Sequence, residues 1–331
     1  MKDQITAAIT IGDPNGIGPE IILKTFKDER LLSEITPIIY SPIEVLDFYI
    51  KNLNLKTELN KISKAQDAAD NKLNVLSFNC HEMLISPGNI TKQGGEIAFQ
   101  SLKKATADLL HLNADIIVTA PINKDNIQNE EFNFLGHTEY FTEKCNQNES
   151  LMLMAHHNLK IGLVTNHLPI EKISENIHES QILNKLLLMH QALKKDFAKS
   201  NPKIALMGLN PHSGDNGLIG NEEKLIIKPT ILAAKKMNIN VSGPFPADGF
   251  FANKNHKKFD GILAMYHDQG LIPFKILSNN EGVNFTAGLP IIRTSPDHGT
   301  GFDIAGKSIA KEESFKNALL MAKSIYKKRN F

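Results

Sequence analysis

Three histidines follow short apolar segments that each have the pattern of a buried strand, and they are well suited to hold a metal. The segments are residues 160–165, 203–208 and 261–266, and the histidines that follow them are His167, His212 and His267. In an open α/β sheet the carboxyl ends of the strands border the crevice where ligands bind. Any one of these histidines could simply cap a strand. Three in equivalent places predict a single divalent-metal site.

Acidic residues near these segments could assist such a metal. Asp268 directly follows His267, and Asp248 follows the segment Gly-Pro-Phe-Pro-Ala. A carboxylate can fix the tautomer of a ligating imidazole, or it can accept the proton of a substrate hydroxyl. Both aspartates are therefore candidate catalytic residues, and a purely structural role stays open for each.

Two glycine-rich segments could bring backbone N–H groups close to an anion. The first, residues 12–20, lies between an expected strand and a helix that begins near Pro19, and it contains Gly12 and Asp13. Its spacing is neither the dinucleotide-binding G-x-G-x-x-G nor a P-loop, so a plain tight turn remains an alternative. The second segment, residues 294–307, could equally be a surface loop. Its candidate cofactor-binding residues are His298, Gly299, Thr300 and Asp303.

Two dispersed cations could hold a phosphate if they converge. Lys275 and Arg293, with Asn284 between them, lie in a stretch that is otherwise apolar or small. An arginine binds phosphate through two parallel hydrogen bonds, whereas a lysine acts as a point charge. Individually, each cation is more simply explained as a surface charge. A separate loop offers His137 and Thr138 beside a glycine.

The composition restricts the class of protein. The chain has 331 residues and a formal net charge of +1 from 37 basic and 36 acidic side chains, so no nucleic-acid or membrane partner is expected. Its two cysteines form no C-x-x-C pattern, which favours a reducing compartment. No apolar stretch approaches the length of a membrane span, and the first residues carry no secretory pattern, so we expect a cytoplasmic protein.

Apolar runs alternate with amphipathic patterns along the chain, which is typical of an α/β fold with a mostly parallel sheet. Besides the three segments above, strands are expected at 5–11, 38–40 and 115–120, and helices at 94–112, 179–195 and 312–327. Met189 is expected in the core. No linker marks a domain boundary.

With these motifs in place, the chain resembles the 4-hydroxythreonine-4-phosphate dehydrogenase (PdxA) family over essentially its whole length. The matching segments are ITIGDPNGIGPEI near the start, ADIIVTAPINK at 114–124, LGHTE at 135–139, TNH at 165–167, LNPHSGD at 209–215, GPFPADGFF at 243–251, MYHDQG at 265–270 and the TSPDHGTGFDIAGK segment. Two of them also look like segments of isocitrate and isopropylmalate dehydrogenases.

The resemblance implies a fold of two α/β/α domains of the isocitrate/isopropylmalate dehydrogenase type, with the active-site cleft between them. We expect residues 1–125 and 286–331 to form the cofactor-side domain, and residues 126–285 to form a central domain with the metal ligands and dimer contacts. The resemblance also implies a homodimer in which two of the metal-ligating histidines come from one subunit and the third from its partner.

The residue roles that the resemblance implies follow the matching positions. His167, His212 and His267 correspond to metal ligands, and the residues that correspond to substrate-binding positions are His137, Thr138, Lys275, Asn284 and Arg293. Lys275 joins the two aspartates as a candidate catalytic residue. We expect NAD or NADP as the cofactor, and zinc as the metal, with cobalt, manganese and magnesium as alternatives.

The family reaction oxidises the 3-hydroxyl of 4-phosphooxy-L-threonine to 2-amino-3-oxo-4-phosphooxybutanoate, which decarboxylates to 3-amino-2-oxopropyl phosphate on the way to pyridoxal 5'-phosphate. Three alternatives remain open at this point. The substrate could be threonate or erythronate 4-phosphate, the three histidines could serve a metal-dependent hydrolase, or the chain could bind a phosphorylated metabolite without catalysis.

Overall fold

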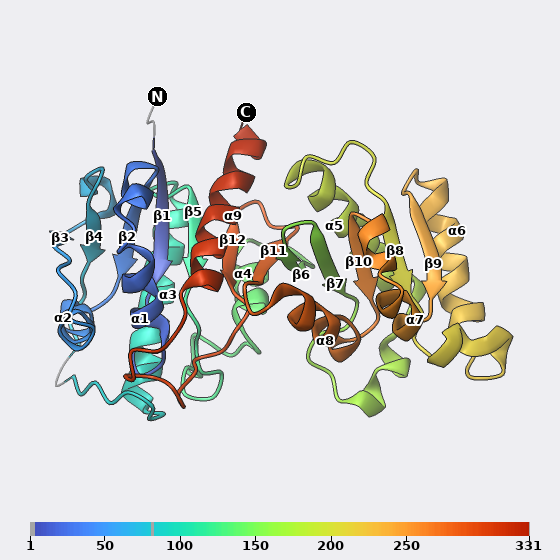
Figure 1. Cartoon of the computed structure of the whole chain (residues 1–331), viewed down its shortest axis with the longest axis horizontal. Helices are drawn as coiled ribbons and strands as arrows, with labels where there is room; N and C mark the ends of the chain where they lie inside the picture. The colour runs from blue at the N-terminus through green and yellow to red at the C-terminus, as the bar shows by residue number, and fades with distance from the viewer. Residues whose placement is uncertain (1–3, 81–82, 331) are drawn as a thin grey trace. The chain divides into compact units, whose positions relative to one another are not determined.

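The computed structural model describes residues 4–80 and 83–330, which fall into two compact units (Figure 1). Unit 1 comprises the described residues up to Tyr140 together with Pro290–Lys327, and unit 2 comprises Phe141–Leu289 and the residues from Lys328 onward. The crossings thus lie at Tyr140 and Leu289, whereas the sequence places the boundaries at 125/126 and 285/286. No linker composition marks either crossing, and Tyr140 lies inside a helix. The expectation about the first three residues lies outside the described part of the chain.

Unit 1 contains a parallel sheet built from buried apolar strands. The strands are β1 (Ile5–Thr10), β2 (Ile35–Tyr40), β3 (Leu59–Ile62), β4 (Leu73–Leu76), β5 (Ile116–Thr119) and β12 (Arg293–Pro296). Their order is β3-β4-β2-β1-β5-β12, and every neighbouring pair is parallel. β1, β2 and β5 are buried at every residue, as strands covered on both faces must be.

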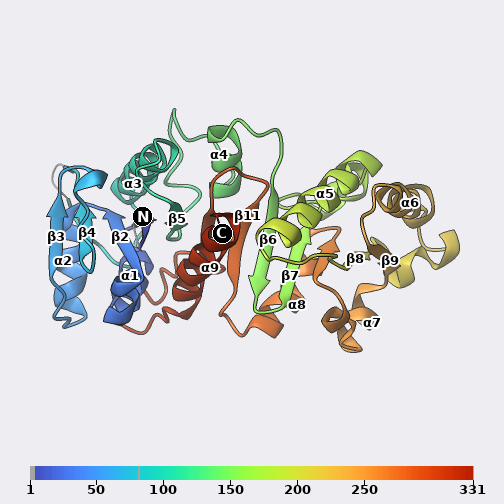
Figure 2. The same cartoon turned by 90° about the horizontal axis from the view of Figure 1, so that it is seen from above.

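Helices cover both faces of this sheet. They are α1 (Gly18–Thr25), α2 (Ile43–Asn52), α3 (Lys92–Leu110) and most of α9 (Glu313–Asn330), with short 3₁₀ turns η1 (Glu29–Ser33) and η2 (Ala65–Asp67). Figure 2 shows α3 on one face and α1 with α2 on the other. α3 begins after Thr91, whose hydroxyl accepts a hydrogen bond from the Gly94 N–H at 3.0 Å and so caps the helix.

Unit 2 contains a mixed sheet. Its strands are β6 (Leu151–His156), β7 (Leu159–Leu163), β8 (Ile204–Met207), β9 (Val241–Phe245), β10 (Gly261–Ala264) and β11 (Val283–Ala287). Their order is β11-β6-β7-β10-β8-β9. β6 is antiparallel to both of its neighbours, whereas β7, β10, β8 and β9 are parallel. The carboxyl ends of the four parallel strands therefore meet at one edge of the sheet.

Helices also cover both faces of the second sheet, with α5 and α6 on one face and α7 and α8 on the other (Figure 2). The elements are the second half of α4 (His137–Lys144), α5 (Glu179–Lys195), α6 (Lys228–Lys236), α7 (Ala247–Ala252), α8 (His267–Ser278) and the short turns η3 (Ile170–Lys172), η4 (Ser174–Asn176), η5 (Pro211–Gly217), η6 (Glu223–Ile227) and η7 (Asn255–Lys258). α8 packs closely on β7 and β10 because Gly270 has no side chain there. A Cβ at this position would lie 2.6 Å from Leu163 Cδ2.

The expected elements are confirmed, with ends that shift by up to three residues. The helix at 179–195 begins and ends where the sequence predicts, and Met189 is fully buried in the core. β6 and β11 were not expected, because the βαβ pattern does not predict a strand that reverses direction. No helix among the described residues has both the length and the apolar character that crossing a bilayer requires.

Candidate active site

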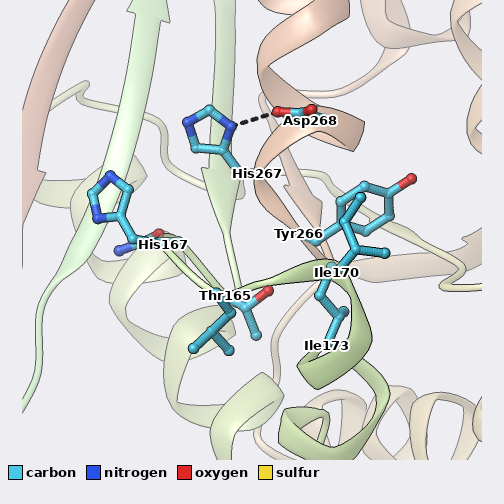
Figure 3. A pocket seen from close by; sticks show the side chains of 9 residues that line it. Thr165, His167, Ile170, Ile173, Tyr266, His267 and Asp268 are labelled. Carbon is cyan, nitrogen blue, oxygen red and sulfur yellow. Dashed lines mark hydrogen bonds and ion pairs between the residues drawn. The ribbon is translucent and has the colours of Figure 1, made fainter.

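Two of the three predicted histidines lie side by side at the carboxyl edge of the unit 2 sheet. Beyond the strand ends, β7 and β10 remain joined, since the Thr165 N–H and hydroxyl both donate to the Met265 carbonyl, at 3.1 and 2.8 Å. This pairing brings together the loops that carry His167 and His267, whose ring centroids lie 6.0 Å apart (Figure 3).

The pair lines a pocket of about 250 Å³ that belongs wholly to unit 2. Figure 3 shows the His267 ring between His167 and the carboxylate of Asp268. The Asp268 Oδ1 lies 2.7 Å from His267 Nδ1, which leaves Nε2 as the nitrogen available to a cation. A carboxylate on one ring nitrogen is the usual support of a metal-ligating imidazole. The remaining lining residues are Thr165, Asn166, Leu168, Ile170, Ile173 and Tyr266.

His212 lies at the same edge, after β8, but outside this pocket. Residues 212–216 form one turn of left-handed helix, with His212 at φ 52° and Asp215 at φ 41°. Left-handed backbone is costly for non-glycine residues and persists only where the surroundings impose it. Among the described residues, the three predicted ligands do not form a group whose ligand atoms lie within 4.8 Å of one another.

Two residues that the sequence analysis did not single out hold these loops. The buried Glu223 accepts hydrogen bonds from the backbone N–H groups of Leu209 and Asn210, at 2.8 and 2.7 Å, and so supports the left-handed turn. Gln269 accepts from the Met265 N–H at 2.7 Å and donates to the Gly208 carbonyl at 2.6 Å, which joins the ends of β10 and β8. The only sequence signal for Gln269 was its position two residues after His267.

The other predicted residues of unit 2 do not line the pocket. Asp248 is exposed in the first turn of α7, and Lys275 is exposed in the last turn of α8. Asn284 lies on β11, where its side-chain Oδ1 is buried without a hydrogen-bond partner among the described residues. Such an oxygen is costly unless a donor reaches it, and a ligand N–H or O–H could supply one.

Unit 1 holds a compact cationic cluster around Arg293. This side chain is only 1% exposed, and its guanidinium donates to the Thr119 hydroxyl from Nε and Nη2, at 3.1 and 2.7 Å. Burial lowers the pKa of Arg293 to about 9, although Glu139 opposes the shift. A buried cation calls for a compensating anion. Glu139 supplies negative charge to the Arg293 guanidinium.

His137 belongs to the same cluster. Its pKa lies well below the usual value, first because of desolvation and then because Arg293 and Lys124 carry like charge. The imidazole is therefore neutral at pH 7 and can donate or accept a hydrogen bond without adding charge. Thr138 follows it in the first turn of α4, partly exposed.

The two glycine-rich segments lie against each other in unit 1. The Ile17 N–H donates to the Thr300 carbonyl at 2.8 Å, and a Cβ at Gly16 would lie 2.7 Å from the same oxygen. Gly12 has φ +69°, and a Cβ there would lie 2.3 Å from the Pro121 carbonyl, so only glycine fits. At Gly299, by contrast, a Cβ would meet nothing within 4 Å.

Asp13 supports the first of these segments. It is fully buried, and its carboxylate accepts hydrogen bonds from the Asn126 amide and the Asn15 N–H, at 2.8 and 2.9 Å. Burial raises its pKa and these two hydrogen bonds oppose the rise. In the second segment, His298 Nδ1 lies 3.0 Å from the Gly299 carbonyl, and Asp303 is exposed.

Comparisons with known proteins place this arrangement in a family. The model of the pyridoxal phosphate biosynthetic protein PdxA matches residues 33–322. The chain belongs to the PdxA family. It is 44% identical to the 4-hydroxythreonine-4-phosphate dehydrogenase of Bacteroides thetaiotaomicron, over 99% of this chain and 90% of that protein. It is 36% identical to the D-threonate 4-phosphate dehydrogenase of Pectobacterium atrosepticum, over 95% and 97% of the two chains.

A solved member of the PdxA family supports the fold. The crystal structure of 4-hydroxythreonine-4-phosphate dehydrogenase from Klebsiella pneumoniae covers 98% of both chains, with a TM-score of 0.83 and 33% identity. The α/β fold class and the membership in a dehydrogenase family are thereby confirmed. Membership of such a family implies a nicotinamide cofactor.

Proposed function

We propose that this chain oxidises 4-phosphooxy-L-threonine at its 3-hydroxyl with NAD or NADP, in the biosynthesis of pyridoxal 5'-phosphate. The product, 2-amino-3-oxo-4-phosphooxybutanoate, is a β-keto acid that decarboxylates to 3-amino-2-oxopropyl phosphate. The observation that carries the proposal is that His167 and His267 line one pocket in a chain of the PdxA family. The Asp268 carboxylate lies beside Nδ1 of His267 and leaves Nε2 for a cation.

The residues of this pocket fit a divalent cation. Asp268 orients His267 so that Nε2 is presented, and His167 lies beside it. Imidazole donors suit zinc, cobalt or manganese better than magnesium, so zinc is the metal that we assign. A cation held by neutral imidazoles keeps its full charge and lowers the pKa of a hydroxyl that it binds. Asp268 is engaged with His267, so Asp248 is the group proposed to exchange the proton.

The substrate phosphate is assigned to the cluster around Arg293. The buried guanidinium supplies a fixed charge, and the neutral His137 with Thr138 supplies hydrogen bonds that add no charge. Such hydrogen bonds discriminate between substrates by geometry as well as by charge. In unit 2, Lys275 and Asn284 are proposed as further substrate-binding residues, because the buried Asn284 Oδ1 suits a donor group of a ligand.

The cofactor is assigned to the two glycine-rich segments of unit 1. Gly12 and Gly299 allow close approach of the backbone, and Thr300 and His298 lie beside them. Asp13 is assigned to hold the first segment in shape through Asn126 and Asn15. A nicotinamide cofactor held by these segments would supply the hydride acceptor, and the protein would contribute alignment.

We further propose a homodimer in which the third metal ligand comes from a second copy of the chain. Large apolar side chains are exposed close in sequence to His167 and His212, with Ile170 at 83% and Leu218 at 82% exposure. Such residues are typical of a surface that another protein covers. The incomplete grouping of the three histidines supports the same proposal.

The proposed reaction is tested by following reduction of NAD and of NADP with 4-phosphooxy-L-threonine. We expect turnover that a chelator abolishes and that added Zn²⁺ restores. D-Threonate and D-erythronate 4-phosphate are assayed in parallel, because a relative named D-threonate 4-phosphate dehydrogenase is 36% identical to this chain. A site built around one polar group rejects an analogue that leaves its partner unpaired, so one substrate class should dominate.

The outcomes separate the candidate functions. If the protein oxidised only D-threonate 4-phosphate, the proposed amino-acid substrate would be wrong, but the proposed dehydrogenase activity would stand. Release of phosphate without cofactor reduction would favour a hydrolase. Tight binding without any reaction would contradict catalysis.

The shared active site is tested by mixing inactive variants. We mix His167→Ala, His212→Ala and His267→Ala in the three pairwise combinations after reversible subunit dissociation. If one ligand comes from the partner, the two mixtures that include its variant recover activity, to about a quarter of the wild-type value under random pairing, and the third mixture stays inactive. Failure of all three mixtures, with heterodimers verified, would contradict a shared site.

A further inference from the structure

We propose that His156, His157 and Glu281 form a divalent-cation site that is separate from the His167–His267 pocket. Their ligand atoms all lie within 4.8 Å of one another, and they are the one group of three or more potential metal-ligating side chains found at this spacing among the described residues. Two imidazoles and one carboxylate are a donor set that Zn²⁺ and its neighbours Co²⁺, Ni²⁺ and Cu²⁺ take. The inference does not depend on the proposed function.

The antiparallel pairing of β6 with β11 brings these residues together. His156 ends β6, and His157 begins the two-residue turn to β7, with φ +46°. On the other strand Val283 pairs with Ala155, so continuing the register by one and two residues places Gly282 opposite His156 and Glu281 opposite His157. Glu281 is further fixed by its N–H, which donates to the Ser278 carbonyl at 2.9 Å.

The side chains already face one another. The His156 and His157 rings lie 4.2 Å apart between centroids, and His156 Nε2 lies 3.6 Å from the Glu281 carboxylate. That nitrogen is buried and has no hydrogen-bond partner among the described residues. A cation between the imidazoles and the carboxylate would satisfy it, and small side-chain rotations would shorten these separations to bonding distance.

This site lies at the opposite edge of the sheet from His167 and His267. β7 starts just after the His156–His157 turn and leads at its other end toward His167. Likewise, α8 begins at His267 and ends at Ser278, close to Glu281, and a helix of this length spans about 18 Å. The two sites are therefore distinct, and a cation at the second would tie the β6–β7 turn to the segment between α8 and β11.

One neighbouring charge opposes the cation. Lys160 donates from Nζ to the His157 carbonyl at 2.8 Å, so this carbonyl is already engaged. The remaining coordination positions are thus left to water.

The test is the number of zinc ions bound per chain, measured by elemental analysis after equilibrium dialysis against micromolar Zn²⁺. We compare the wild-type protein, Glu281→Gln, the double variant His156→Gln/His157→Gln, and a control, His111→Gln, at an exposed position in unit 1. We expect the wild-type protein and the control to bind equally, and both site variants to bind one equivalent fewer. Equal zinc content in all four proteins would overturn the proposal.

A second set separates this site from the proposed active centre. His267→Ala should lose a different equivalent, and its combination with Glu281→Gln should lose both. With Co²⁺ in place of Zn²⁺, the visible absorption of the His267→Ala protein should disappear when Glu281→Gln is added. Retention of that absorption would overturn the second site without touching the first. Unchanged far-ultraviolet circular dichroism of Glu281→Gln excludes unfolding as the cause of a loss.

Discussion

The candidate residues of the two units differ in how completely the chain surrounds them. In unit 1, Arg293 is 1% exposed, and its guanidinium donates two hydrogen bonds to the Thr119 hydroxyl. The position of its charge is therefore fixed before any ligand binds. In unit 2, the side chain of His267 is 41% exposed, and His212 lies outside the pocket that His167 and His267 share. The Arg293 side chain is therefore pre-organised within one chain, whereas the proposed metal centre calls for further components.

The elements that carry the residues explain this difference. Arg293 is the first residue of β12 and pairs in register with Ile117 of β5, so its backbone is part of a sheet. His167 and His212 instead lie on loops beyond their strands, and His267 lies at the start of α8. A binding residue on a strand is positioned by the backbone hydrogen bonds of the sheet. A binding residue on a loop depends instead on individual hydrogen bonds such as those of Glu223 and Gln269.

The largest effect is expected from His267→Ala. Loss of this ligand should lower kcat/KM by about a thousandfold or more, or ~4 kcal/mol of transition-state stabilisation, with unchanged far-ultraviolet circular dichroism. The control is His178→Ala, at the exposed N-cap of α5, which should keep wild-type kinetics. Near-normal turnover of His267→Ala would contradict the proposal that His267 binds a catalytic metal.

Arg293→Met should instead act on binding. We expect a KM for the phosphorylated substrate that is about 10–100-fold higher, because a hydrogen bond to a charged group contributes about 1.5–3 kcal/mol, while kcat changes much less. Steady-state kinetics give both constants. An unchanged KM with a reduced kcat would show that Arg293 serves the chemical step, and the contrast between the two units would fail.

Asp268→Asn tests the support of the exposed centre. The carboxylate accepts from His267 Nδ1, and its loss should weaken metal affinity by about 10–100-fold without abolishing the site. Competition with a chromophoric chelator measures the affinity. The expected signature is activity that returns when excess Zn²⁺ is added. Activity that stays low at saturating Zn²⁺ would instead make Asp268 the proton acceptor.

The smallest effects are expected from a pair of glycine variants in unit 1. Gly12→Ala places a Cβ against the Pro121 carbonyl at positive φ and should destabilise the protein by about 1–3 kcal/mol. Gly299→Ala meets nothing within 4 Å and should leave stability within about 0.5 kcal/mol while raising the KM for NAD. Thermal denaturation and cofactor titration measure the two quantities. A stable Gly12→Ala protein would contradict the close approach of Gly12 to the Pro121 carbonyl.

The sequence predicted the strands β1, β2, β5, β7, β8 and β10, the helices α1, α3, α5 and α9, and the edge of the unit 2 sheet at which His167 and His267 lie. It did not predict β3, β4, β9 or β12. Buried parallel strands are continuous apolar runs, and their ends are marked by polar residues such as Asn166 and Asp268. β6 and β11 were missed because an apolar run does not encode its direction. Glu223 was missed as well, because its partners are backbone N–H groups distant in sequence, and side-chain spacing carries no sign of them.

The places where the chain passes between the two compact units have no mark in the sequence. One crossing falls inside α4, where Tyr140 is buried against Phe132 as an ordinary core residue. The left-handed turn at His212 was equally hidden, because four of its five residues are not glycine and Glu223, which supports it, is distant in sequence. In each case the deciding interactions are long-range.

The most direct test is a crystal structure of the zinc-loaded protein, with anomalous scattering at the zinc absorption edge. Our account predicts a zinc ion bound by Nε2 of His267 together with His167 and His212, one of the three coming from a second copy of the chain. An anomalous map that leaves these three imidazoles without a common metal would contradict it.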